Sequence, residues 1–165
     1  MVKPLPLHIL TEEFSNNHIV AYSLEGHPIY WTEMQERLDF WKAKLKGVSQ
    51  IKVAVYHKNA IDFLCILSIL WSLKKIPVIP ENTLKTTLKV VEEETDYFIG
   101  EFPKFKTSSK TNITKISSNK EISDLALIIF TSGSSGKPKA VYKTFKQLNS
   151  ELKIIENNWG KLTKD

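Results

Sequence analysis

Residues with hydroxyl, glycine and lysine side chains are concentrated in one short stretch of this sequence, positions 131–139. They are Thr131, Ser132, Gly133, Ser134, Ser135, Gly136, Lys137 and Lys139, with Pro138 between the two lysines. The glycines allow the backbone to approach an anion closely, so that successive N–H groups can point toward it. The hydroxyls add further donors, and the lysines add the positive charge that a polyphosphate requires. We therefore interpret this stretch as a phosphate-binding loop.

The spacing of the glycines distinguishes this loop from a Walker A loop. That motif places four residues between its glycines and a Ser or Thr after its lysine. Here only Ser134 and Ser135 separate the glycines, and Pro138 follows Lys137. Because proline lacks an N–H group and has a fixed φ, a helix cannot begin directly after the loop. A nucleotide-hydrolysing switch is therefore disfavoured, while composition alone leaves a flexible Ser/Gly linker as an alternative.

Apolar patterning predicts the elements that must position the loop. The run at 125–130 has no polar alternation and predicts a strand buried on both faces. Further strands are predicted at 51–56, 76–80, 97–100 and 140–142, and two short strands within 19–29 are joined by a turn at 25–27. Helices are predicted from Thr32 to a stop at Gly47, from a cap at Asn59 to about 74, at 83–95 and at 145–159.

This alternation of strands and helices predicts an α/β fold, with a layered, largely parallel sheet flanked by helices. The phosphate loop would follow the carboxyl end of a strand, where ligands bind in open α/β sheets. The prolines at 77 and 80 suggest that strand 76–80 lies at an edge of the sheet or at a strand end. Residues 101–123 predict a polar surface connection, and residues 1–165 a single domain or an incomplete N-terminal subdomain.

Helical spacing separates core positions from surface positions. Residues at steps of three and four predict a buried face rather than a cofactor site: Met34, Leu38, Trp41 and Leu45. In the helix at 83–95, Leu84, Leu88 and Val91 should point inward and residues 92–94 outward. The last helix carries a second apolar face: Phe145, Leu148, Leu152, Ile155 and Trp159. Cys65 lies in an apolar segment and is expected to be a buried hydrophobic residue.

Composition narrows the class of protein. The 165 residues are 42% hydrophobic and 25% charged, which is ordinary for a globular domain. The net charge of +5 comes from lysine, and because Arg37 is the only arginine, sequence-specific nucleic-acid binding is disfavoured. One cysteine and four scattered histidines predict neither a disulfide framework nor a metal site on protein ligands. Without a signal peptide or a membrane-spanning segment, we expect a cytoplasmic location.

Residues 124–141, DLALIIFTSGSSGKPKAV, resemble the ATP-phosphate motif of the adenylate-forming superfamily. That superfamily includes acyl- and aryl-CoA synthetases, nonribosomal adenylation domains and firefly luciferase. Weaker similarity extends over 26–34 and 51–80. Lys75 stands where the family usually has glycine, so the turn before residue 76 must be built differently. Phe145 replaces the histidine of a usual Thr/Ser–His pair, so the role of that histidine near the acyl site does not carry over.

The resemblance implies that ATP activates a carboxylic acid, whose acyl group then passes to the thiol of CoA or a carrier protein. Residues 131–137, with Lys139, would hold the β- and γ-phosphates, and no residue is implied as a nucleophile or general base. In the superfamily the residues that contact adenine, ribose and Mg²⁺ lie far downstream of this loop. We therefore expect about the first third of such an enzyme, inactive alone and able to self-associate through residues 145–159. A non-catalytic anion-binding or protein-interaction module is the alternative.

Overall fold

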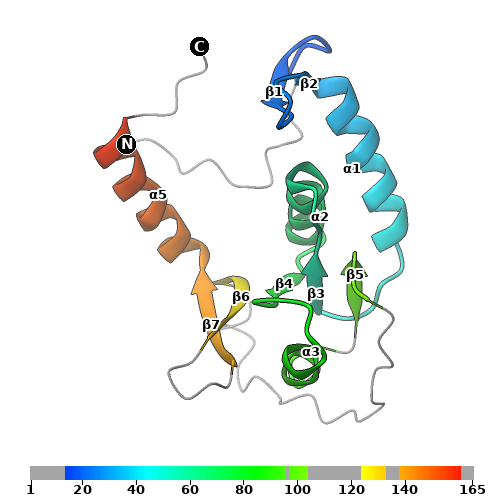
Figure 1. Ribbon diagram of the computed structural model, residues 1–165, viewed down its shortest axis with the longest axis vertical. Helices are drawn as coiled ribbons and strands as arrows, with labels where there is room; N and C mark the ends of the chain where they lie inside the picture. The colour runs from blue at the N-terminus through cyan, green and yellow to red at the C-terminus, as the bar shows by residue number, and fades with distance from the viewer. Residues whose placement is uncertain (1–13, 96, 104–123, 133–137, 161–165) are drawn as a thin grey trace.

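The computed structural model describes residues 14–95, 97–103, 124–132 and 138–160. Its main layer is a five-stranded sheet in the order β5–β3–β4–β6–β7, and a separate hairpin is formed by β1 (Ile19–Tyr22) and β2 (Pro28–Tyr30) (Figure 1). The sheet strands are β3 (Lys52–Tyr56), β4 (Ile76–Ile79), β5 (Phe98–Gly100), β6 (Leu125–Ser132) and β7 (Pro138–Thr144). Within the five-stranded sheet, all neighbouring strands are parallel except β6 and β7, which are antiparallel. The predicted α/β class with a largely parallel sheet is therefore confirmed.

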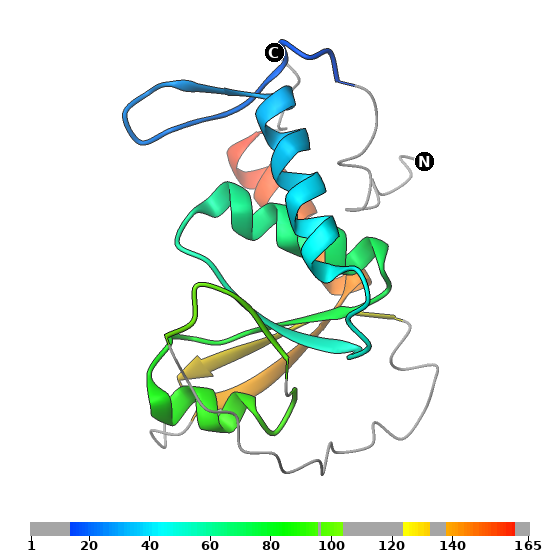
Figure 2. The same cartoon turned by 90° about the vertical axis from the view of Figure 1, so that its right-hand side faces the viewer.

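Helices cover both faces of this sheet. They are α1 (Trp31–Leu45), α2 (Ala60–Ser72), α3 (Lys85–Val91) and α5 (Phe145–Trp159). Figure 2 shows α1 and α2 on one side of the sheet and α3 on the other. The alternation of side chains along β3 explains both layers, because Val53 and Val55 pack with α1 and α2, whereas Ala54 packs with Val91 of α3.

The larger core lies between the sheet, α1 and α2. The predicted apolar face of α1 is buried there, together with Trp31 at its first position. Helix α2 buries most of its circumference, and its cap is the predicted Asn59, whose Oδ1 accepts the N–H groups of Ile61 (2.9 Å) and Asp62 (3.1 Å). Helix α1 begins one residue earlier than predicted, at Trp31, where the Glu33 side chain reaches back and accepts the N–H of Tyr30 at 3.2 Å.

Of the two positions that the prolines suggested for β4, a sheet edge is wrong, because β4 lies in the middle of the sheet, whereas Pro80 does directly follow the end of the strand. Ile76 donates its N–H to Ile51 on the β3 side at 2.8 Å, so the nitrogen of Pro77 points toward β6. In a regular ladder that position would donate to the carbonyl of Ala126. The Trp71 indole N–H donates to this carbonyl instead, at 2.6 Å. A side chain of α2 therefore supplies the hydrogen bond that proline lacks.

The turn between α2 and β4, where Lys75 replaces the family's usual glycine, is built on two lysines. Lys74 has a left-handed φ of 55°, and the Lys75 N–H donates to Leu70 at 2.8 Å, which closes the helix end. The Lys75 ammonium donates to the carbonyls of Val48 (2.7 Å) and Gln50 (2.8 Å). The side chain thus ties this turn to the segment that follows α1.

Helix α3 is shorter than predicted, and its surroundings correct two expectations. Leu88 and Val91 are buried as expected, but Leu84 precedes the helix and is exposed. Glu94 was predicted to point outward, yet its side chain is only 13% exposed and pairs with Lys52. Both differences arise because the helix runs only from Lys85 to Val91, so that Leu84 before it and Glu94 after it do not follow helical spacing.

Candidate phosphate-binding site

The predicted phosphate loop connects the two antiparallel strands β6 and β7. Thr131 and Ser132 are the last residues of β6, and Lys139 is the second residue of β7. The structure therefore assigns these three residues to strands rather than to the loop. Gly133, Ser134, Ser135, Gly136 and Lys137 lie outside the described residues. Strands therefore flank residues 133–137 on both sides.

Strand pairing brings Thr131 and Lys139 side by side. Their Cα atoms are partners in the β6–β7 register. The preceding pair, Phe130 and Ala140, packs into the cluster on the α3 face, so Thr131 and Lys139 face the opposite side of the sheet. Both are exposed. A hydroxyl donor and an ammonium group consequently share one face next to the loop, while Ser132 alternates to the other face.

Strand β6 ends at an edge of the sheet that is typical of ligand sites. Because β6 is parallel to β4, both strands end at the same edge of the sheet. The chain continues from β4 through α3 to β5 beyond β3, whereas β6 continues to β7 on the other side. The two connections diverge between neighbouring strands, and such divergence opens a crevice for ligands at the carboxyl edge of an α/β sheet.

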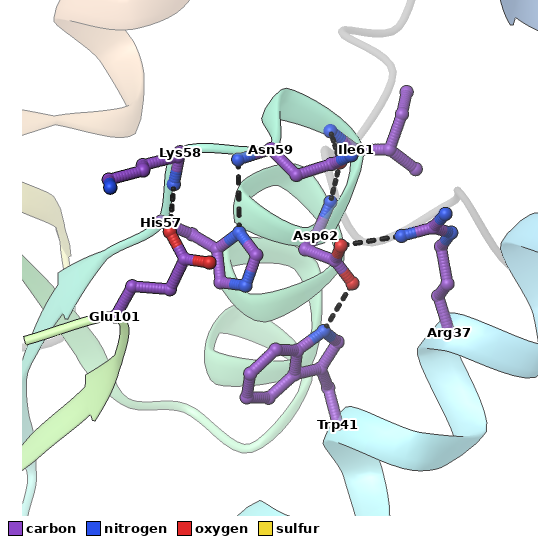
Figure 3. Close-up of polar contacts among 8 residues, drawn as sticks. All are labelled: Arg37, Trp41, His57, Lys58, Asn59, Ile61, Asp62 and Glu101. Atoms are coloured by element: carbon purple, nitrogen blue, oxygen red, sulfur yellow. Dashed lines mark hydrogen bonds and ion pairs between the residues drawn. The ribbon is translucent and has the colours of Figure 1, made fainter.

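Polar groups at the carboxyl ends of β3 and β5 are engaged with one another (Figure 3). The Lys58 N–H donates to Oε2 of Glu101 at 3.0 Å, and the Asn59 N–H donates to Nδ1 of His57 at 3.1 Å. Glu101 directly follows β5, and His57 directly follows β3. The Lys58–Glu101 hydrogen bond links the segments that directly follow β3 and β5.

The only arginine of the chain has a structural role. Arg37 of α1 donates to Oδ2 of Asp62 at 2.5 Å, and the Trp41 indole N–H donates to Oδ1 of the same carboxylate at 2.9 Å (Figure 3). Asp62 lies in the first turn of α2, so one carboxylate connects the two helices. With Arg37 committed to this pair, positive charge for a phosphate must come from lysine.

Neither a nucleophile nor a metal site is evident in the described ranges. Cys65 is fully buried, and burial, followed by the charge of Asp62, raises the pKa of its thiol to about 11, against a smaller lowering by Arg37. The prediction of a buried hydrophobic cysteine is therefore confirmed. Among the described residues, no three His, Cys, Asp or Glu side chains gather to hold a metal ion. The helices in these residues include none long and apolar enough to cross a membrane.

Trp71 of α2 contacts the end of the β6–β7 hairpin that is remote from Thr131 and Lys139, and the sequence pattern missed this role. Besides its bond to Ala126 of β6, its ring meets that of Phe145 edge-on, with centroids 5.9 Å apart. Phe145 opens α5, and Thr144 caps this helix by accepting the Gln147 N–H at 3.2 Å. A buried tryptophan N–H normally finds a partner, which is the only signal that the sequence offered, and it does not identify the acceptor.

No protein-family model matches the sequence. The chain is 42% identical to malonate–CoA ligase from Arabidopsis thaliana over 40 residues, which are 24% of this chain and 7% of that protein. o-Succinylbenzoate CoA synthetase (MenE) from Bacillus subtilis superposes with a TM-score of 0.61 at 16% identity, over 90% of this chain and 35% of that one. The N-terminal subdomain of Klebsiella oxytoca NpsA gives a TM-score of 0.53 at 19% identity, over 78% and 38%.

The described residues therefore have the fold of the N-terminal domain of adenylate-forming enzymes. Within that class, the neighbours are of the acyl-CoA synthetase type, and they include the N-terminal domain of FACL13 from Mycobacterium tuberculosis, with a TM-score of 0.51 at 14% identity. The resemblance inferred from residues 124–141 is confirmed at the level of the fold. The chain spans 35% of one MenE chain and 46% of another, less than half of each.

Proposed function

We propose that this chain forms the N-terminal part of an ATP-dependent ligase that activates a carboxylic acid. The observation that carries the proposal is the pairing of Thr131 with Lys139 beside a Ser/Gly loop, at the carboxyl edge of an adenylate-forming fold. MenE, which shares this fold, has been solved in complex with ATP and a magnesium ion. Both facts support ATP as the substrate of the present chain, with Mg²⁺ expected in the complete enzyme.

The proposed reaction has two steps. A carboxylate oxygen attacks the α-phosphorus of ATP, the bond from that phosphorus to the bridging oxygen breaks, and pyrophosphate leaves with the electron pair. The thiol of CoA or of a carrier protein then attacks the acyl carbon, and AMP leaves. In the first step, residues 131–137 and Lys139 would bind the β- and γ-phosphates and stabilise the charge on the departing pyrophosphate. These residues bind and orient, and none of them exchanges a proton.

The last helix supports the view that this chain acts with further polypeptide. No residue of α5 is buried, although all of its residues are described. Leu152 is 44% exposed and Trp159 is 87% exposed. Because the solved neighbours are more than twice as long as the shared region, their additional residues suggest what would cover such a face. The ligase would act in the cytoplasm, and the chain alone would not complete the reaction.

The exposed face of α5 also favours a second candidate, a non-catalytic relative that binds another protein. The two candidates differ in their dependence on polyphosphate. An enzyme part requires Lys139 for the adenylation step, whereas an interaction module does not.

Substitution of Lys139 tests the proposal in a ligase that contains this chain. Lys139→Ala should slow acyl-adenylate formation by ~10²–10³, since removal of one preorganised donor costs about 2.7–4 kcal/mol. Thioester formation from supplied acyl-adenylate involves no pyrophosphate and should be nearly unchanged. Lys153→Ala, at an exposed lysine of α5, is the matched control. Equal losses in both half-reactions would show a general disturbance of the fold and would contradict the phosphate role.

A further inference from the structure

Glu94 joins two parts of the sheet that are distant in sequence. One oxygen of its carboxylate pairs with the Lys52 ammonium, and the other accepts the hydroxyl of Tyr142. The side chain of Lys52 is 8% exposed and that of Glu94 13%, whereas Tyr142 remains 45% exposed at the edge of the molecule. The three side chains come from the start of β3, the segment after α3 and the middle of β7.

The strand register explains how Tyr142 reaches Glu94. Tyr142 lies opposite Ile128, Ile128 opposite Val78, and Val78 opposite Ala54, so one row crosses the sheet from β7 to β3. The last three pack in the cluster with Val91, which identifies this as the α3 face. Lys52 precedes Ala54 by two residues and therefore points to the same face. Tyr142 extends beneath β6 and β4 toward the end of α3.

The segment that carries Glu94, the hydrogen-bond acceptor, is held firmly to β3. The Glu94 N–H donates to Val91 at 2.9 Å, and the Thr95 hydroxyl donates to the carbonyl of Lys52 at 2.5 Å. The Ala54 N–H donates to Tyr97 at 2.8 Å. Among the described strands, by contrast, β7 pairs only with β6. Glu94 is therefore the fixed partner, and β7 is the element that the contact restrains.

We propose that Lys52, Glu94 and Tyr142 form a clamp that holds the β6–β7 hairpin and so positions Thr131 and Lys139. Tyr142 is three residues from Lys139 in the same strand, a separation of about 10 Å at the usual rise. The Lys52 charge compensates the buried carboxylate, and a charge-assisted hydrogen bond from Tyr142 transmits that fixed position to β7. The positioning role rests on the proposed function, whereas the clamp itself is a property of this chain.

The chemistry of Tyr142 suits a permanent donor. Burial, followed by the hydrogen bond to Glu94 and its charge, raises the pKa of Tyr142 to about 12. The hydroxyl therefore keeps its proton over the whole neutral range. Removal of this hydroxyl leaves the Lys52–Glu94 pair intact, so the effect on β7 can be separated from the effect on the core.

Hydrogen exchange of the full chain tests the clamp. Tyr142→Phe should accelerate exchange of the β7 amides about tenfold, because one charge-assisted hydrogen bond to the strand is lost. The urea midpoint should fall slightly, because the same hydrogen bond is also lost on global unfolding, whereas local openings of β3 that leave the clamp intact should be unaffected. Tyr22→Phe, at an exposed tyrosine of β1, is the matched control and should change neither the exchange of β7 nor the midpoint. Glu94→Gln should accelerate exchange in both strands, since it leaves the buried Lys52 ammonium without a counter-charge.

Two results would overturn the clamp: unchanged exchange of β7 in Tyr142→Phe, or an equal acceleration of β7 in the Tyr22→Phe control, which would show that the effect is not specific to the Tyr142 hydroxyl. ATP binding by the unsubstituted chain is measured on the same preparation. Its absence would contradict the proposed function, whereas the exchange of β7 would still decide whether the clamp exists.

Discussion

Helices α2 and α5 are similar in length, yet they differ in how the chain covers them. Six residues of α2 are buried, from Cys65 to Leu70, whereas none of α5 is. Helix α2 is enclosed by α1 and the sheet, and Asp62 links it to Arg37. Helix α5 is attached mainly through its first turns, where Phe145 meets Trp71 and Glu151 pairs with Lys143. Helix α2 is therefore covered within this chain, whereas the described residues leave the apolar face of α5 uncovered.

This difference teaches that apolar spacing predicts which face of a helix will be buried, but not whether this chain supplies the partner. It also places the candidate site at the boundary of the two regions. Thr131 and Lys139 lie on a hairpin that the enclosed part of the sheet supports from one side. Because the two regions differ in burial, they should also differ in what they contribute to the free energy of unfolding.

Leucine truncation gives the largest expected contrast. Leu70→Ala should lower the free energy of unfolding by about 3 kcal/mol, because Leu70 is fully buried in α2. Leu152→Ala in α5 should change it by less than about 0.5 kcal/mol, since Leu152 is 44% exposed and no residue of this helix is buried. Urea unfolding of both variants measures the contrast, and equal losses would show that α5 is covered in solution.

The hydrogen bonds of Asp62 that link α1 and α2 should contribute moderately to the free energy of unfolding. Asp62→Asn keeps an oxygen for Trp41 but removes the charge that pairs with Arg37. We expect a loss of about 1–2 kcal/mol in the free energy of unfolding, the range for a charge-assisted hydrogen bond that is partly buried. Asp39→Asn, at an exposed position of α1, is the control. A loss of the same size in the control would mean that the α1–α2 contact adds nothing specific.

Self-association is the smallest effect in energy and depends on concentration. The apolar face of α5 should make the isolated chain associate and bind a hydrophobic dye. The double variant Leu152→Gln and Ile155→Gln should reduce both, with little change in the unfolding midpoint, because both side chains are exposed. Sedimentation over a range of concentrations measures the association. A monomer at high concentration, without dye binding, would contradict the expectation.

Most of the fold could be predicted from the sequence because strand and helix periods are local properties. Examples are the buried apolar face of α1, the capping of α2 by Asn59 and the buried apolar residues of β6. The central position of β4 could not be predicted, since it depends on Trp71 replacing a hydrogen bond across the sheet. The inward turn of Glu94 likewise depends on Lys52, which is far away in sequence.

The site was predicted by residue type, but its arrangement needed the strand register. The sequence pattern placed Thr131 and Ser132 together in a loop, whereas pairing with β7 directs them to opposite faces of the sheet. Thr131 is instead the register partner of Lys139, a pairing that spacing alone did not suggest. The roles of residues 133–137 stay predictions.

Direct binding of polyphosphates tests the central claim, that this hairpin holds the β- and γ-phosphates of ATP. Calorimetric titration of the 165-residue chain would compare ATP, tripolyphosphate and AMP. The account predicts that ATP and tripolyphosphate compete for one site, that AMP binds far more weakly, and that Lys139→Ala, unlike Lys153→Ala, weakens ATP binding about tenfold. Equal affinities for ATP and AMP, with no competition by tripolyphosphate, would contradict it.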